Sequence, residues 1–411
     1  MDQGKVFMKI GQVGLGYVGL VNAAVLANHG NTVVGIDTDK KRIEELSNRH
    51  IPIYEPMLKE YLMTGEKNLL FSDNYAQLVG CDIIFITVPT PNKNGKIDLS
   101  YVFNSCKKIS EISHSSILVI KSTVLPGTAN KIHSRTAMNV ISNPEFTREG
   151  SAIHDTEKPD RIVIGGQHPE LVEKVWNFTG SEVVCTTNEN AEMIKYASNS
   201  FLATKISFIN QLADLCERVP NTDVNTVAYG MGLDRRIGKD FLKAGLGYGG
   251  SCFPKDTLAF IAFAESKKVD LSLIKEASEY NKKRVPSLVS KIIKKAGDLK
   301  DKRICVLGAS FKDHTDDLRE SKALDLINEI RNLGSIVNVY DPVVKQIEGR
   351  KNCNSAEECI QNSDIVITAT EWNVFSNIEP NLLKSKLVFD LRRILDHNKY
   401  NVTMSVGLGK N

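Results

Sequence analysis

The sequence predicts an α/β protein with two doubly wound parallel-sheet domains joined by a long central helix. Three observations predict this class. Short apolar strand-like runs alternate with helical stretches near the N-terminus, the same alternation returns near the C-terminus, and a long helical pattern lies between them. We therefore divide the chain into an N-terminal domain at 1–187, a central helical region at 188–290 and a C-terminal domain at 291–411.

The N-terminal region begins with a strand, a glycine-rich turn and an apolar helix, which we expect from Val18 to Asn28. Its strand-like runs are apolar enough to lie inside a parallel sheet. We expect these strands at Lys9–Val13, Thr32–Asp37, Asp82–Val88 and Ile117–Lys121. Such strands alternating with helices predict a doubly wound domain.

The C-terminal region repeats this plan. Its sequence VNVYD at 337–341 resembles VVGID at 33–37, and both end a strand in aspartate. The repeat indicates a nucleotide-shaped ligand in each domain, although the second lacks the full glycine signature. We expect strands at Arg303–Leu307, Ile336–Asp341, Asp364–Ala369 and Lys386–Asp390, and a helix near Ser321–Leu333.

The central region reads as one helix from Asn190 to Val219, because its apolar residues recur at helical spacing. A helix of that length spans roughly 45 Å. Its apolar positions are too many for a connector that faces solvent. This excess predicts a homodimer or a higher homo-oligomer that assembles through the helix.

The composition, with 42% hydrophobic and 25% charged residues, is ordinary for a soluble globular chain. A net charge of +3 is too small to indicate a nucleic-acid surface. No apolar run approaches the ~20 residues of a membrane helix. The residues from Met1 to Phe7 lack the apolar core of a signal peptide. We therefore expect a cytoplasmic protein with no membrane or nucleic-acid partner.

The chain has eight cysteines. None forms a Cys-x-x-Cys pair, and no histidine cluster has the spacing of a zinc site. We expect no metal, and we expect the cysteines to be reduced thiols, most of them packed as small buried side chains.

The pattern Gly14-x-Gly16-x-x-Gly19 follows a strand, opens a helix and precedes Asp37 at the end of the next strand. This context is typical of a dinucleotide site, where the pyrophosphate lies at the helix N-terminus and the acid binds the ribose hydroxyls. A glycine-rich turn without a ligand is the structural alternative. The predicted cofactor is NAD, bound by Gly14, Gly16, Tyr17, Val18, Gly19 and Asp37.

Three cations follow Asp37 closely: Lys40, Lys41 and Arg42. They are either a solvated helix face or a binding site for the additional phosphate of NADP.

A second glycine loop, GLGYGGSCFPKD at 245–256, places Cys252 close to Lys255 and Asp256. Its glycines allow backbone amides to approach a ligand. A lysine beside a thiol favours the nucleophilic thiolate. The alternative is a tight turn with a buried cysteine.

GGSCFPKD at 249–256 resembles the active-site signature of the UDP-glucose/GDP-mannose dehydrogenase family. Other landmarks of the family follow in order along nearly the whole chain. They are IGQVGLGYVGL, VPTP at 88–91, KSTVLPGT at 121–128, NPEF at 143–146, PDRIVIG at 159–165, AEMIKYASNSFLA at 191–203 and DDLRES at 316–321. The resemblance implies two Rossmann-like domains joined by a long helix, with NAD on the first and the nucleotide sugar mainly on the second.

The resemblance also implies catalytic roles. Cys252 resembles the family nucleophile, and Asp256 resembles the carboxylate that holds water or assists proton transfer. Lys195 and Asn199, four residues apart on one helical face, match the pair that stabilises charge on the reacting oxygen. Glu145 resembles the general base or water-activating residue, with Thr123 as its hydrogen-bonding neighbour.

Ligand contacts are implied in the same way. For NAD, the matching positions are Arg42, Thr90, Thr123, Glu149 and Arg319. For the sugar nucleotide they are Glu145, Phe146, Lys195, Asn199, Phe311, Lys312, Arg392 and the loop from Phe241 through Lys243 and Tyr248 to Gly249. Arg236 resembles a residue that the neighbouring subunit supplies.

Three positions depart from the family pattern. Lys322 replaces a proline, Thr147 replaces a leucine, and Leu391 replaces a glycine. The last change makes the placement of Arg392 near the sugar less secure, because leucine restricts the backbone there.

By resemblance, the expected reaction is a four-electron oxidation of a sugar CH2OH to a carboxylate, which needs two NAD per sugar. Phe253 beside the cysteine favours UDP-glucose, whereas GDP-mannose enzymes tend to carry leucine there. GDP-mannose and other UDP-hexoses remain alternatives within the family. A nucleotide-sugar sensor without catalysis is the alternative from another class.

Overall fold

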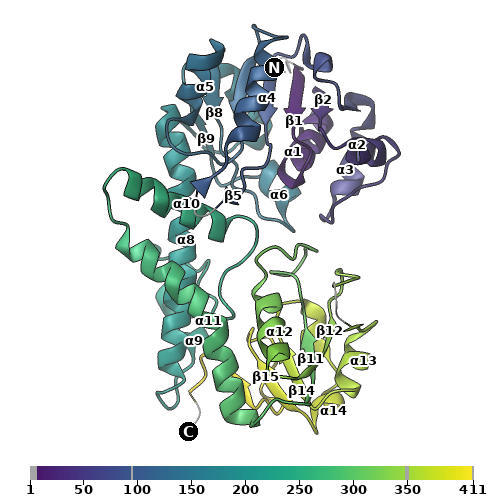
Figure 1. Ribbon diagram of the computed structural model, residues 1–411, viewed down its shortest axis with the longest axis vertical. Helices are drawn as coiled ribbons and strands as arrows, with labels where there is room; N and C mark the ends of the chain where they lie inside the picture. The colour runs from purple at the N-terminus through teal and green to yellow at the C-terminus, as the bar shows by residue number, and fades with distance from the viewer. Residues whose placement is uncertain (1–6, 94–95, 348–350, 410–411) are drawn as a thin grey trace. The chain divides into compact units, whose positions relative to one another are not determined.

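The computed structural model describes residues 7–93, 96–347 and 351–409. The chain divides into two compact units, Met1–Ser198 and Asn199–Asn411. Figure 1 colours them from purple through teal and from green to yellow along the chain. The prediction that the chain lacks a signal peptide rests on Met1 to Phe7, and residues 1–6 of this stretch lie outside the described residues.

The first unit contains an eight-stranded sheet in the order β10-β9-β8-β7-β4-β1-β2-β3. Neighbouring strands are parallel except at β8 and β9. The strands are β1 Lys9–Val13, β2 Thr32–Ile36, β3 Leu69–Ser72, β4 Ile83–Ile86, β7 Ile117–Ile120, β8 Val140–Ser142, β9 Ile162–Gly165 and β10 Val183–Thr186, with a separate hairpin of β5 Asn92–Lys93 and β6 Lys96–Ile97. The strand order reverses between β1 and β4, which is where doubly wound sheets bind nucleotides.

Helices cover both faces of this sheet because alternate residues of each strand point to opposite sides. Ile83 and Phe85 of β4 share a core with α1, whereas Ile84 and Ile86 share a core with α4 and α5. The helices are α1 Tyr17–Asn28, α2 Lys40–Ser47, α3 Leu58–Thr64, α4 Ser100–Ser110, α5 Thr128–Thr136, α6 Ala152–Glu157 and α7 Glu170–Val175.

The long helix α8, Asn188–Cys216, begins in the first unit and continues into the second. The second unit contains a six-stranded parallel sheet in the order β13-β12-β11-β14-β15-β16. Its strands are β11 Arg303–Leu307, β12 Ile336–Tyr340, β13 Lys351–Asn352, β14 Ile365–Thr368, β15 Leu387–Asp390 and β16 Met404–Ser405. Its other helices are α9 Val224–Gly232, α10 Phe253–Ser266, α11 Ser272–Ala296, α12 Lys322–Asn332, α13 Ala356–Gln361 and α14 Pro380–Leu383.

The predicted fold class is confirmed: two Rossmann-like domains and a long helix make up the chain. The helix expected at 190–219 runs from Asn188 to Cys216. Within the part of the chain that the structure describes, no helix is long and apolar enough to cross a membrane.

The expectation that every cysteine is a reduced thiol is wrong for one pair. Cys305 on β11 and Cys359 on α13 form a disulfide, with their Cα atoms 5.4 Å apart. Both side chains are fully buried in the second sheet's core. Packing brings them within the range that a disulfide can span, and their separation of 54 residues hides this proximity from the sequence.

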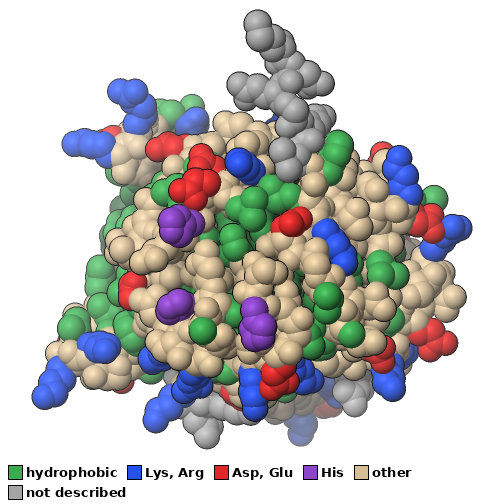
Figure 2. Space-filling view, turned by 90° about the horizontal axis from the view of Figure 1, so that it is seen from above, with side chains coloured by type: hydrophobic (Ala, Val, Ile, Leu, Met, Phe, Trp, Pro, Cys, Tyr) green, Lys and Arg blue, Asp and Glu red, His purple; other side chains and the backbone are tan. Residues whose placement is uncertain are grey.

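On the face shown in Figure 2, basic and acidic side chains are interspersed and form no broad field of one sign.

Candidate active site

The turn between β1 and α1 leaves helix amides available to an anion. Gly16 is the N-cap residue of α1, and it has no side chain that could cap the first amides of the helix. A Cβ on Gly19 would lie 1.8 Å from the carbonyl oxygen of Gly14, so only glycine permits the helix to approach the strand this closely. The first amides of α1 are therefore suited to a pyrophosphate, as the glycine pattern predicts.

Asp37 lies at the end of β2 beside this turn. Its Oδ2 accepts a hydrogen bond from the backbone N–H of Leu15 at 2.8 Å and one from Arg42 Nη1 at 3.3 Å. Lys40 and Lys41, by contrast, have side chains that are 87% and 83% exposed. The two lysines therefore form a solvated helix face, and the carboxylate borders the turn, as an NAD ribose site requires.

Other expected cofactor contacts lie in the same unit. Thr90 is buried and Thr123 is half-buried. The Tyr17 hydroxyl accepts a hydrogen bond from the Gly150 N–H at 2.7 Å, next to Glu149.

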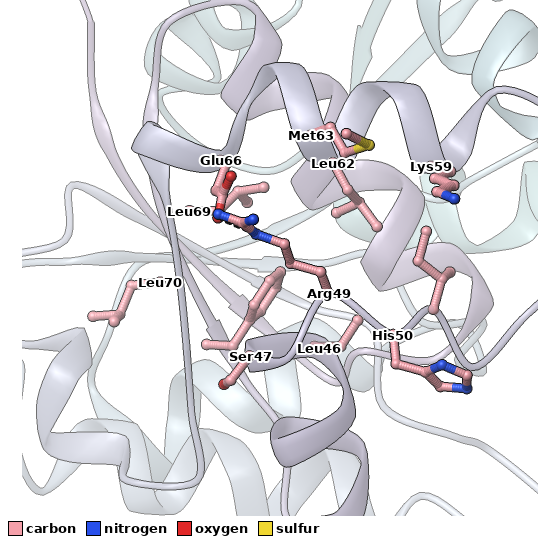
Figure 3. Close-up of a pocket in the computed structure, with 12 residues that line it drawn as sticks. Leu46, Ser47, Arg49, His50, Lys59, Leu62, Met63, Glu66, Leu69 and Leu70 are labelled. Carbon is pink, nitrogen blue, oxygen red and sulfur yellow. Dashed lines mark hydrogen bonds and ion pairs between the residues drawn. The ribbon is translucent and has the colours of Figure 1, made fainter.

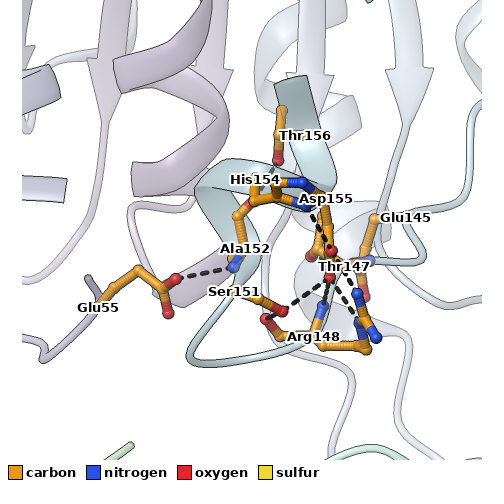
Figure 4. Close-up of polar contacts among 9 residues, drawn as sticks. All are labelled: Glu55, Glu145, Thr147, Arg148, Ser151, Ala152, His154, Asp155 and Thr156. Carbon is orange, nitrogen blue, oxygen red and sulfur yellow. Dashed lines mark hydrogen bonds and ion pairs between the residues drawn. The ribbon is translucent and has the colours of Figure 1, made fainter. Parts of the chain in front are cut away.

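Glu55, which the sequence analysis missed, anchors the loop that carries Glu149. Its carboxylate accepts hydrogen bonds from the backbone N–H groups of Gly150 at 2.6 Å and Ala152 at 2.7 Å. Figure 4 shows Glu55 reaching Ala152 at the start of α6. A lone glutamate in a loop 95 residues from its partner gives no pattern that could have identified it.

Glu145 and Lys195 form a buried ion pair in the first unit. Lys195 Nζ lies 3.2 Å from Glu145 Oε1 and also donates to the Glu145 carbonyl oxygen at 2.6 Å. The two side chains are only 5% and 7% exposed. Both are predicted site residues, and the structure brings them together.

Thr147 completes the environment of Glu145. It donates its backbone N–H at 2.7 Å and its hydroxyl at 2.5 Å to Oε2 of the carboxylate. Burial alone would raise the pKa of Glu145, but Lys195, Thr147 and Lys121 together lower it below its usual value. The carboxylate is therefore held ionised, as a base must be.

This arrangement differs from the expected neighbour of Glu145. Among the described residues, the hydroxyl that contacts the carboxylate belongs to Thr147, and Thr123 makes no hydrogen bond to it. Thr147 reaches the carboxylate because it lies two residues away in the same loop.

Lys121 is a further cation that the sequence analysis did not single out. It is buried, and its ammonium lies 4.7 Å from the centre of the Trp176 ring. Burial, opposed by Glu145 and aided by Lys195, lowers its pKa to about 8. Phe146, predicted to contact substrate, has the Arg161 guanidinium 3.8 Å above its ring.

In the second unit, Cys252 occupies the N-cap position of α10 and is partly exposed. A helix N-terminus stabilises negative charge, so this position favours a thiolate. Its Sγ lies 3.6 Å from the Ser251 hydroxyl. Lys255, expected to promote the thiolate, binds Asp256 Oδ1 at 2.5 Å.

Asp256 is completely buried one turn into α10. Asn199 of α8 donates its amide N–H to Asp256 Oδ2 at 2.7 Å. The structure thus brings together two predicted site residues that are 57 positions apart, and it places Asp256 on the same helix as Cys252.

The glycine loop before Cys252 is held by three buried polar side chains that the sequence analysis missed. Asn210 of α8 accepts the Gly245 N–H at 2.8 Å, and Arg284 of α11 donates to the Gly245 carbonyl at 2.9 Å. Asn281 of α11 accepts the Tyr248 N–H at 2.8 Å and donates to its carbonyl at 3.0 Å. No sequence pattern links these three side chains to the loop.

Gly250 in this loop has a left-handed φ of +81°, and a Cβ there would lie 2.7 Å from the Phe311 ring. This contact places Phe311, one of the expected diphosphate residues, against the loop. Lys312, the other, lies 5.7 Å from the Phe311 ring centre.

Arg392, expected near the sugar, is buried beside the same loop. It donates to the Ala369 carbonyl at 2.8 Å and lies 3.5 Å from Glu371, which also pairs with Lys243. The left-handed backbone falls on Arg393, with φ 56°, so Leu391 needs no conformation that leucine avoids.

Two expected contacts are exposed and paired within their own loops. Arg236 binds Asp234 at 2.6 Å, and Arg319 binds Asp317 at 2.5 Å. Phe241 lies near Phe253, with ring centres 5.9 Å apart. No group of His, Cys, Asp and Glu within the described ranges has the arrangement of a metal site.

The glycine turn, the adjacent aspartate and the cysteine at a helix N-terminus define an NAD-dependent oxidoreductase. Three family models match the chain. They are the NAD binding domain of the UDP-glucose/GDP-mannose dehydrogenase family at residues 8–178, its central domain at 189–283 and its UDP binding domain at 305–397. The chain belongs to the UDP-glucose/GDP-mannose dehydrogenase family.

Known relatives agree with this assignment. UDP-glucose 6-dehydrogenase of Rickettsia prowazekii is 41% identical, over 95% of this chain and 96% of the relative. UDP-glucose 6-dehydrogenase TuaD of Bacillus subtilis is also 41% identical, over 94% and 89% of the two chains. A UDP-glucose dehydrogenase structure from Pyrobaculum islandicum superposes with a TM-score of 0.93 at 32% identity and covers 100% of both chains.

Proposed function

We propose that the chain oxidises UDP-glucose at C6 to UDP-glucuronate, with two NAD consumed per sugar and Cys252 as the covalent nucleophile. The observation that carries this proposal is Cys252 at the N-cap of α10, one turn from the buried Asp256 that Asn199 holds. UDP-glucose 6-dehydrogenases at about 40% identity over most of the chain support the choice of substrate.

The chemistry explains why a thiol is needed. NAD supplies the hydride acceptor for each of the two oxidations. After the first, the C6 aldehyde is captured when the Cys252 thiolate adds to its carbonyl carbon, giving a thiohemiacetal. Loss of the remaining C6 hydrogen as hydride gives a thioester. Water then cleaves the C–S bond, which releases the carboxylate and restores the thiol.

The other residues divide this work. The Lys195 ammonium and the Asn199 amide stabilise negative charge that develops on the C6 oxygen. Glu145, held ionised by Lys195 and Thr147, accepts a proton from the alcohol or from water. Asp256 orients the water that hydrolyses the thioester, and Thr123 contacts NAD.

The remaining assignments follow the family pattern. We propose that NAD is bound by Gly14, Gly16, Tyr17, Val18, Gly19, Asp37, Arg42, Thr90, Glu149 and Arg319. We propose that the nucleotide sugar is bound by Phe146, Phe241, Lys243, Tyr248, Gly249, Phe311, Lys312 and Arg392. The three functional parts are 1–187 for NAD, 188–290 for the nucleophile and assembly, and 291–411 for the UDP moiety.

We further propose a homodimer or higher oligomer formed through α8, in the cytoplasm. Phe201, Phe208 and Leu215 recur every seven residues on this helix and are 65%, 45% and 58% exposed. Seven residues bring a helix back to nearly the same face, so they form one apolar stripe. A partner copy would cover it and could supply Arg236.

The experiment is an NADH assay with purified protein, NAD and a panel of nucleotide sugars. We expect two NADH per UDP-glucose, with UDP-glucuronate as the product and no free aldehyde. Higher catalytic efficiency with GDP-mannose or an N-acetylated UDP-hexose would reassign the substrate. Binding of UDP-glucose without any NADH would identify a sensor.

A further inference from the structure

A hollow of about 450 Å³ opens in the first unit between α2, α3 and the edge strand β3. Its apolar lining includes Leu46, Leu62, Leu69 and Phe71. Figure 3 shows Leu46, Leu62 and Leu69 around the space. None of the residues that line the hollow belongs to the proposed active site, and its volume lies within the range of small-molecule sites.

The mouth of the hollow is also apolar. Met63 of α3 is 61% exposed and Leu70 of β3 is 47% exposed, and both line the hollow. Large apolar side chains gathered around a concave surface lose unfavourable contact with water when an apolar group fills it.

Three basic side chains line this apolar surface. Arg49, His50 and Lys59 line the hollow together with a single acid, Glu66. Arg49 is paired with Glu66 at 2.7 Å. His50 and Lys59 have no ion pair in the part of the chain that the structure describes, and Figure 3 shows them on the same side, across from Glu66.

Arg49 is fixed in an unusual conformation at this site. Its φ is 60°, in the left-handed region that arginine rarely adopts. Two hydrogen bonds hold it there, from its N–H to the Leu46 carbonyl at 3.0 Å and from its Nε to Glu66 at 2.8 Å. Neutralising Glu66 in this way leaves the Lys59 ammonium without a compensating carboxylate at the hollow.

We propose that this hollow binds an amphipathic carboxylate whose apolar chain lies on Leu46, Leu62 and Phe71 and whose carboxylate meets Lys59 and His50. The apolar lining excludes a purely ionic ligand. The Lys59 ammonium, with the His50 imidazole as a hydrogen-bond donor, selects an anion over a neutral chain. A medium-chain fatty acid is the simplest molecule with both properties and a fitting size.

The hollow is connected to the cofactor site through α2. This helix has eight residues, and Leu46 is its one buried side chain. In its first turn, Arg42 pairs with Asp37, which borders the glycine turn. A ligand packed on Leu46 would reduce the mobility of α2. NAD binding would then cost less conformational entropy. We therefore expect each ligand to strengthen the binding of the other. This expectation rests on the proposed NAD site and does not depend on which nucleotide sugar is the substrate.

Calorimetric titration of the full chain with decanoate, below its micelle-forming range, tests the site. We expect saturable binding of one decanoate per chain, and much weaker binding of decanamide and of acetate. The double variant His50→Gln/Lys59→Gln and the variant Leu62→Asp should each weaken decanoate at least about tenfold. Lys67→Gln, a neighbouring lysine outside the hollow, is the matched control and should bind like wild type. Absence of binding, or equal binding by all variants, would overturn the site.

A second titration tests the coupling. With decanoate saturating, the dissociation constant of NAD should fall about threefold, and NAD should tighten decanoate by the same factor because linkage is reciprocal. The effect should vanish in Leu62→Asp. An unchanged NAD affinity despite decanoate binding would overturn the coupling, whatever the activity assay with nucleotide sugars shows.

Discussion

Thr147 donates two hydrogen bonds to one oxygen of Glu145, from its hydroxyl at 2.5 Å and from its backbone N–H at 2.7 Å. The opposite oxygen faces Lys195 at 3.2 Å. The carboxylate of the proposed base is therefore held at both oxygens. Thr147, which departs from the family pattern, holds one of them.

Replacing Thr147 by valine should raise the pKa of Glu145, because the hydroxyl that stabilises its charged form is lost. A depressed carboxyl pKa keeps the base ionised down to low pH, so the acid limb of the kcat/KM profile should move to higher pH. We expect kcat at neutral pH to fall by about tenfold. Thr147→Ser restores the hydroxyl and should restore the profile. An unmoved acid limb in Thr147→Val would exclude this role.

Cys252→Ala should abolish formation of the acid, with a loss of at least ~10³-fold in kcat, because the aldehyde can no longer be captured. Binding of NAD and UDP-glucose should remain, as measured by calorimetry. Cys185→Ala, at an exposed cysteine, is the matched control. Cys252→Ser should accumulate a slowly hydrolysed ester visible in the intact mass. Two NADH per sugar from Cys252→Ala at the wild-type rate would disprove the nucleophile.

Asp37→Ser should reduce the preference for NAD over NADP by at least about tenfold in kcat/KM. The substitution removes a carboxylate that repels a ribose phosphate and frees Arg42 to bind one. Lys40→Ala, at a side chain that is 87% exposed, should leave the preference unchanged. The assignment fails if Asp37→Ser keeps the full preference for NAD.

Glu192 should make folding stability depend on pH. Burial raises its pKa to about 7, even though the backbone N–H groups of Ala129 and Gly127 and the Ser142 hydroxyl oppose the shift. Since the folded pKa lies above the unfolded value, the stabilising contribution is complete at low pH and is lost as pH rises through 7. The free energy of unfolding should decline from pH 5 to 8, at up to about 1.4 kcal/mol per pH unit from this group.

Denaturant titrations of Glu192→Gln across the same range measure this contribution, because the variant should lack it. Glu189→Gln, at an exposed residue of the same helix, should behave like wild type. A constant difference between wild type and Glu192→Gln at every pH would refute the prediction.

Phe208→Asp should dissociate the proposed oligomer, because a carboxylate in an apolar contact loses its hydration without gaining a partner. Light scattering should then report the mass of one chain. Leu273→Asp, on α11 and 73% exposed, is the control and should keep the wild-type mass. A wild-type protein that is monomeric and fully active at micromolar concentration rules out this assembly.

Much of the fold could be predicted because its signals are local. The runs at 9–13 and 303–307 form strands with the predicted bounds, and α1 begins one residue before the predicted start. Apolar runs, glycine turns and helical spacing act within a few residues, so the sequence displays them directly.

The unpredicted features depend on distant contacts. Glu55 meets Gly150 across 95 residues, and Cys305 meets Cys359 across 54. Asn281 and Arg284 look like ordinary residues of a charged helix until packing turns them toward the loop before Cys252. Single positions of this kind carry no periodic signal, and only the folded chain reveals their partners.

The loop before the nucleophile takes its shape from side chains on two helices. Asn210 comes from α8, and Asn281 and Arg284 come from α11, which lies after the loop in the chain. During synthesis, Cys252 therefore emerges before Asn281 and Arg284, two of the three side chains that shape this loop. The loop before Cys252 cannot take its final shape until α11 has packed. Nascent or truncated chains that end before residue 281 should therefore be inactive.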